Sequence, residues 1–181
     1  MNEYWSDFDD AKVVLFPESA LTGILLSQDE RSFLSSIGLP DSAAPFLSFE
    51  CPVGQLVSVS DQWRQGNEFR KYKVIGANGS GDPIALDASC GNVVYLNHDD
   101  NFTKVFINTL PSKLAASLKA FGVVVADSLK ENGEDAYLDN NIPIHVQERF
   151  KKEMKAIDFA ALQPGSFWHE QVESMAGGPW S

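Results

Sequence analysis

The chain has 181 residues, of which 44% are hydrophobic, and its formal net charge is −11. This length and composition predict one globular domain over residues 1–181 and argue against intrinsic disorder. The excess of acid disfavours direct binding to the phosphates of DNA or RNA. No apolar run approaches the roughly 20 residues that a helix needs to cross a bilayer.

Several features indicate a cytoplasmic protein. The N-terminal segment is acidic and lacks the basic and apolar regions of a secretory signal. Cys51 and Cys90 lie far apart and form no Cys-x-x-Cys motif, which predicts two reduced thiols. The acidic charge would suit a basic protein partner, because opposite charges raise the encounter rate. The alternative is that it only keeps the protein soluble.

The first clear element is a short helix over 28–37. Ser27 and Glu30 have the spacing of a capping box, with Ser27 as N-cap and Glu30 at the third helical position. Gly38 is suited to the left-handed position after the helix, and Pro40 prevents its continuation. We expect the residues before Leu25 to lie at the periphery, so that the core spans about 25–176.

An antiparallel meander follows the helix. Strands are predicted over 72–75, 83–86, 93–96 and 103–107, because turns rich in Asn, Gly and Asp separate these apolar runs. Shorter strands are expected over 46–49 and 56–59, and a loop over 60–69.

Helices dominate the last third of the chain, which completes an α+β order. Ser112 is the expected N-cap of the first helix, and Ser166 that of the last. Apolar residues recur at helical spacing in three stripes. The stripes are Leu114, Leu118, Phe121, Val125 and Leu129; Ile142, Val146, Phe150, Met154 and Ile157; and Trp168, Val172 and Met175.

The glycine-rich turn at 76–82 favours neither a nucleotide nor a calcium site. It lacks a phosphate-loop motif, and a strand rather than a helix follows it. Asn78, Ser80 and Asp82 alternate as calcium ligands do, but Ser89 stands where a calcium loop needs a bidentate Glu. A hairpin turn is the simpler interpretation.

The remaining polar clusters also lack the pattern of an active site. His98, Asp99 and Asp100 are adjacent on one turn, whereas zinc needs three or four convergent ligands. His145 and His169 fall on helices elsewhere in the chain. We therefore predict no catalytic residues, no cofactor and no metal.

The expected loop over 60–69 is polar apart from Trp63 and Phe69, and Trp63 is the large aromatic residue within it. It is either a core anchor or an exposed hot spot for a partner.

In order, the motifs resemble one known group of proteins. They are F-L-x-x-I-G-L-P over 33–40, F-L-S-F over 46–49, Y-K-V-I-G-x-N-G-S-G-D-P-I-A-L-D over 72–87, G-x-V-V-x-L-x-H-D over 91–99 and V-F-I-N-T-L over 105–110. The set resembles the SUKH superfamily, with its Smi/Knr-type fold, and within it bacterial immunity proteins whose helix ends in Gly-Leu-Pro. The resemblance implies a curved antiparallel sheet flanked by helices.

The resemblance also implies a non-enzymatic protein that binds and blocks a cognate toxin, such as a nuclease or deaminase. Candidate contact residues are the acidic turn residues and their aromatic and histidine neighbours: Trp63, Asp82, Asp87, His98, Asp99 and Asp100. The alternative is a regulatory or scaffold module that binds a protein unrelated to toxins.

Overall fold

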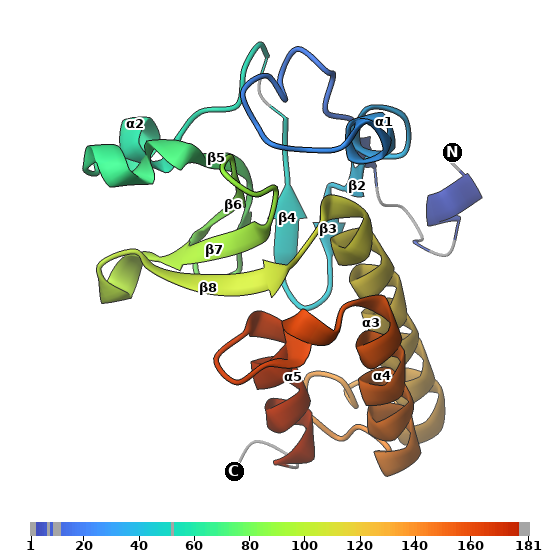
Figure 1. Cartoon of the computed structure of the whole chain (residues 1–181). Coiled ribbons are helices and arrows are strands. Elements are labelled where there is room, and N and C mark those ends of the chain that lie inside the picture. The colour runs from blue at the N-terminus through green and yellow to red at the C-terminus, as the bar shows by residue number, and fades with distance from the viewer. Residues whose placement is uncertain (1–2, 7, 9–11, 52, 178–181) are drawn as a thin grey trace.

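A six-stranded antiparallel sheet lies at the centre of the protein (Figure 1). The computed structural model describes residues 3–6, 8, 12–51 and 53–177. The sheet is open, and its strands lie in chain order. They are β3 (Ser42–Ala43), β4 (Leu47–Phe49), β5 (Tyr72–Asn78), β6 (Pro83–Asp87), β7 (Val93–Asn97) and β8 (Thr103–Asn108). This arrangement confirms the predicted α+β class and the meander.

The other elements are helices and one two-stranded pairing, β1 (Val13–Val14) with β2 (Leu39–Pro40). The α-helices are α1 (Gln28–Ser36), α2 (Val59–Trp63), α3 (Pro111–Asn132), α4 (Ile144–Ile157) and α5 (Phe167–Ala176). Short 3-10 helices are η1 (Glu3–Trp5), η2 (Asn67–Lys71), η3 (His98–Asp100) and η4 (Phe159–Leu162). Within the described ranges, no helix is long and apolar enough to cross a membrane.

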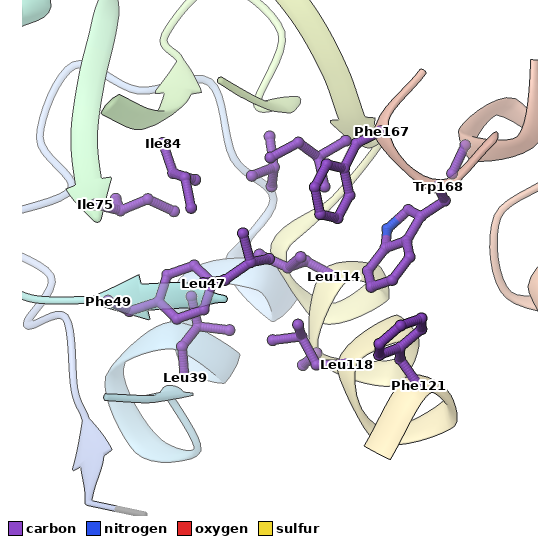
Figure 2. Packing of buried hydrophobic residues seen from close by; sticks show 14 of the residues in the cluster. Leu39, Leu47, Phe49, Ile75, Ile84, Leu114, Leu118, Phe121, Phe167 and Trp168 are labelled. Atoms are coloured by element: carbon purple, nitrogen blue, oxygen red, sulfur yellow. The ribbon is translucent and has the colours of Figure 1, made fainter. Parts of the chain in front are cut away.

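The two faces of the sheet bury different sets of side chains, because successive residues of a strand point to opposite sides. Ile75 and Ile84 belong to the main core, together with residues of α1, α3, α4 and α5. Figure 2 shows these side chains near Leu114 and Leu118 of α3, with Trp168 of α5 beyond them. On the opposite face, Val74 and other strand residues form a smaller cluster that α2 and η2 cover.

The predicted first helix is confirmed at both ends. The Ser27 hydroxyl accepts a hydrogen bond from the Glu30 amide at 3.2 Å, and Gly38 has a left-handed φ of +72°. The Glu30 carboxylate does not complete the capping box. It accepts hydrogen bonds from the amide and hydroxyl of Ser112, at 3.0 and 2.5 Å, and so joins α1 to the start of α3.

The structure corrects the expectations for 56–69. This stretch contains α2 and η2 rather than a strand followed by a loop. Ser58 makes only an isolated bridge to Lys73, and its hydroxyl accepts a hydrogen bond from the Asp61 amide at the start of α2. The short apolar run at 56–59 could not reveal this, because a cap and one helical turn leave no periodic signal.

The start and the buried face of α3 also differ from the prediction. Leu110, not Ser112, occupies the N-cap position, and Pro111 opens the helix. Beyond Phe121 the buried face continues through Val124 and Ser128 rather than through Val125 and Leu129. The reason is that a straight helix repeats every 3.6 residues, so positions 124 and 128 share a face with Phe121 as well as positions 125 and 129 do. The polar Ser128 conceals the buried row in the sequence.

Described residues before Leu25, a segment expected at the periphery, contribute to the core. Trp5, Phe16 and Leu21 are almost completely buried. The Arg31 guanidinium donates to the carbonyl oxygens of Leu21 and Ile24, at 3.0 and 2.5 Å, and holds this irregular segment against α1. Its apolar residues follow no regular period, so only tertiary contacts reveal their role. Of the tail 177–181, which was expected to be peripheral, residues 178–181 lie outside the described residues.

Candidate functional site

The β5–β6 and β7–β8 turns lie together at one end of the sheet. The carboxylate of Asp82, in the first turn, accepts hydrogen bonds on one oxygen from the His98 amide at 2.8 Å, and the His98 Nδ1 lies 2.6 Å from the same oxygen. The His98 Nε2 lies 3.4 Å from the Asp99 carboxylate. The structure thus brings together four of the predicted site residues, Asp82, His98, Asp99 and Asp100.

These four residues have different environments. Asp82 is buried, whereas Asp99 and Asp100 are exposed. Burial alone would raise the pKa of Asp82, but hydrogen bonds from the His98 amide, from the Asn78 side chain and from the His98 ring outweigh it and lower the pKa. Asp82 therefore ties the two turns together as an ionised acceptor, while the exposed carboxylates face solvent.

Asp87 lies at the opposite end of the sheet, where β6 ends. It is also buried, and it accepts hydrogen bonds from the Ser89 amide at 3.0 Å and from the Ser89 hydroxyl at 2.5 Å. Burial opposes these contacts, but they and the nearby Lys71 ammonium lower the pKa of Asp87. The structure does not bring Asp87 to the other candidates, and its contacts stabilise the β6–β7 turn.

Trp63 is half-buried at the end of α2. Its ring lies 6.5 Å from that of Phe102, which in turn lies 5.8 Å from Phe69. These three aromatic rings cover the smaller cluster on the outer face of the sheet. Trp63 thus takes part in packing and remains partly exposed.

The titratable side chains form no metal centre in the part of the chain that the structure describes. No group of three or more His, Cys, Asp or Glu residues there lies close enough to hold an ion. His145 and His169 lie on α4 and α5, as the sequence predicted.

An apolar groove of about 580 Å³ runs beside α3 and was not predicted. Phe46, Val123 and Tyr137 line it, from the β3–β4 turn, from α3 and from the loop after α3. A smaller hollow of about 270 Å³, partly formed by Leu138, lies on the other side of Phe46 and Tyr137. The sequence did contain one sign of an exposed apolar surface on α3. The run 122–125 (Gly-Val-Val-Val) supplies this helix with more apolar residues than one buried face needs.

Together these features define an α+β protein built on an open antiparallel meander that helices flank on both faces. The model of the SUKH-4 immunity protein family matches residues 6–174. The chain therefore belongs to the SUKH-4 immunity protein family, which confirms the resemblance seen in the motifs; such families are generally non-catalytic. No curated protein and no solved structure matched the chain.

Proposed function

We propose that this chain is a cytoplasmic immunity protein that neutralises a cognate bacterial toxin by direct binding, without catalysis. The observation that carries the proposal is the family match over residues 6–174. The formal charge of −11 supports a basic partner, such as the nucleic-acid-binding surface of a nuclease or deaminase. The mechanism is occlusion of that surface, with no role for nucleic acid or membrane.

Within this proposal, the exposed turn carboxylates Asp99 and Asp100 attract the toxin. His98 and Trp63 supply neighbouring contacts. Asp82 acts indirectly, because its buried carboxylate fixes the turn that carries His98. Asp87 has only an indirect part, because it stabilises the β6–β7 turn at the opposite end of the sheet.

The test uses the product of the gene beside the one for this chain, which the proposal expects to be a toxin. Co-production of the chain is expected to restore growth of cells that make the toxin, and the two purified proteins are expected to form a stable complex. Lack of protection together with lack of complex formation would refute the proposed function. Tight binding to a host protein that is not a toxin would support the alternative of a regulatory or scaffold module.

Variants that remove charge show whether the turn carboxylates act on the association of the toxin or on the stability of the complex. The double variant D99N/D100N is expected to lower the association rate constant several-fold at low salt and to leave the dissociation rate nearly unchanged. The matched control D29N/E148Q removes two exposed carboxylates on α1 and α4. If the control slows association as much as D99N/D100N, the turn has no special part in the encounter.

A further inference from the structure

We propose that the groove beside α3 anchors a partner segment in which a large apolar side chain is flanked by Lys or Arg. The inference rests on the proposed function and specifies the part of the toxin that the chain holds. In this account, Asp99 and Asp100 attract the toxin during the encounter, and the groove holds it in the final complex.

The groove exposes large apolar side chains on both of its walls. Phe46 is 65% exposed and Val123 is 46% exposed, and Leu138, in the adjoining hollow, is 61% exposed. The Phe46 and Tyr137 rings lie 6.3 Å apart and separate the two concavities. Exposed apolar side chains that gather around a concavity are typical of binding sites, whereas single ones carry no such meaning.

The backbone at Phe46 supports a functional role. Phe46 has a φ of +59°, a left-handed conformation that Gly and Asn adopt more easily than Phe. Gly79 lies directly beneath it, where an added Cβ would be 3.0 Å from the Phe46 Cβ. The chain thus keeps an exposed aromatic ring at the tip of a turn where a small or polar residue would be more stable.

Charge near the groove determines the chemistry of the partner. The loop after α3 carries three exposed carboxylates, Glu134, Asp135 and Asp139, and residues 132–143 include no Lys or Arg. Tyr137 of this loop lines both concavities. A partner segment with an apolar side chain flanked by Lys or Arg could therefore place that side chain in the groove and its cations beside the loop carboxylates.

Among the described residues that line the groove, Lys119 is the one cation, and it does not reverse the preference for a basic partner. Its ammonium donates to the Tyr4 carbonyl oxygen at 2.8 Å and lies 4.9 Å from the centre of the Tyr4 ring. A second copy of this chain is a poorer occupant, because it would bring two chains of charge −11 together.

The first experiment measures binding of fluorescent probe peptides to the purified chain by anisotropy. One peptide carries Leu at helical spacing with Lys between, a second replaces every Lys with Glu, and a third replaces every Leu with Ser. We expect only the Leu/Lys peptide to bind. Equal binding of the Leu/Glu peptide or of the Ser/Lys peptide would overturn the proposal.

Two variants locate the binding. F46N removes the ring and places Asn, which tolerates the left-handed conformation, so the fold is expected to be retained. It should weaken binding of the Leu/Lys peptide by about tenfold or more, because an apolar contact is lost. V123K, which places a cation in the groove, should do the same. The control I144S changes an exposed apolar residue at the start of α4, 73% exposed, and should have no effect. Unchanged binding in both F46N and V123K would overturn the proposal.

The protection assay with the neighbouring toxin distinguishes this inference from the proposed function. If the wild-type chain protects cells and F46N and V123K do not, both stand. If the variants protect as well as the wild type, the groove is not the anchoring surface although the immunity function holds. Failure of the wild-type chain to protect would refute the immunity function, whereas the peptide measurements would still decide the chemistry of the groove.

Discussion

Glu30 provides the sharpest test of how the helices are held together. Its carboxylate is buried, 6% exposed, and accepts hydrogen bonds from the amide and the hydroxyl of Ser112, 82 positions along the chain. The Ser112 amide lies in the first turn of α3, where helical amides have no partner within the helix. E30A would leave two donors without their acceptor and remove a negative charge from the positive end of the helix dipole.

The size of the effect follows from these two contacts. A hydrogen bond to a charged group contributes about 1.5–3 kcal/mol, and loss of a helix cap costs about 0.5–2 kcal/mol. Because water can reach Ser112 once the carboxylate is gone, the two contributions do not add in full. We expect E30A to lower the free energy of unfolding by about 2–4 kcal/mol. For a chain of this length, the melting temperature should fall by about 3 °C per kcal/mol.

Urea unfolding followed by circular dichroism measures the change. E30Q keeps one acceptor oxygen and should lose about half as much as E30A. The matched control D29A removes an exposed carboxylate from the same helical turn and should cost no more than about 0.5–1 kcal/mol. If E30A and D29A destabilise the protein equally, the link between α1 and α3 does not stabilise the fold as argued. Additive effects in the double variant E30A/S112A would contradict the argument as well.

Three further predictions concern the turns and the core. The lowered pKa of Asp82 means that its contribution to stability is present above the ordinary carboxyl pKa of about 4 and is lost as the pH falls through the lower native value. The difference in unfolding free energy between wild type and D82N, measured in urea from pH 7 to pH 2.5, should therefore shrink below about pH 4; a constant difference would contradict the assignment. G81A and G91A both place a side chain at positive φ, +84° and +79°, but only the Cβ at position 91 would meet a backbone carbonyl oxygen, at 2.6 Å. We expect G81A to cost about 1 kcal/mol and G91A about 2–4 kcal/mol by thermal unfolding, and equal costs would refute the steric argument. W168F removes the hydrogen bond of 2.9 Å from the Trp168 indole to the buried Asn108 oxygen and should cost about 1–3 kcal/mol in the same assay, whereas an unchanged melting temperature would show that the bond is not needed.

Local sequence signals were sufficient to predict an element when the residues that define it and its ends lie close together in the chain. The cap at Ser27, the stop at Gly38 and the meander from Tyr72 onward depend on backbone preferences and on turn chemistry, which act over two to six residues. The ordered motifs also identified the family. The prediction for 56–59 was wrong because a four-residue segment with three apolar residues does not distinguish a strand from a cap followed by one helical turn.

Residue types alone could not assign the turn aspartates. Asp82 and Asp87 look the same in sequence as Asp99 and Asp100, yet the first pair is buried and the second is exposed. The difference arises because neighbouring groups donate hydrogen bonds to the first pair: the His98 amide and the Asn78 side chain to Asp82, and the Ser89 amide and hydroxyl to Asp87. The part that these residues play toward a partner stays a prediction.

By itself, the sequence determined the class of fold, the order of the strands and the positions of the main turns, because these depend on neighbouring residues. The features that depend on packing between distant residues were decided only by the tertiary structure. It placed the Glu30 carboxylate on the first turn of α3, buried Phe16 and Leu21 of the irregular N-terminal segment, and gathered Phe46, Val123 and Tyr137 around one groove. These residues lie far apart along the chain, and no local preference connects them until the sheet and helices have packed.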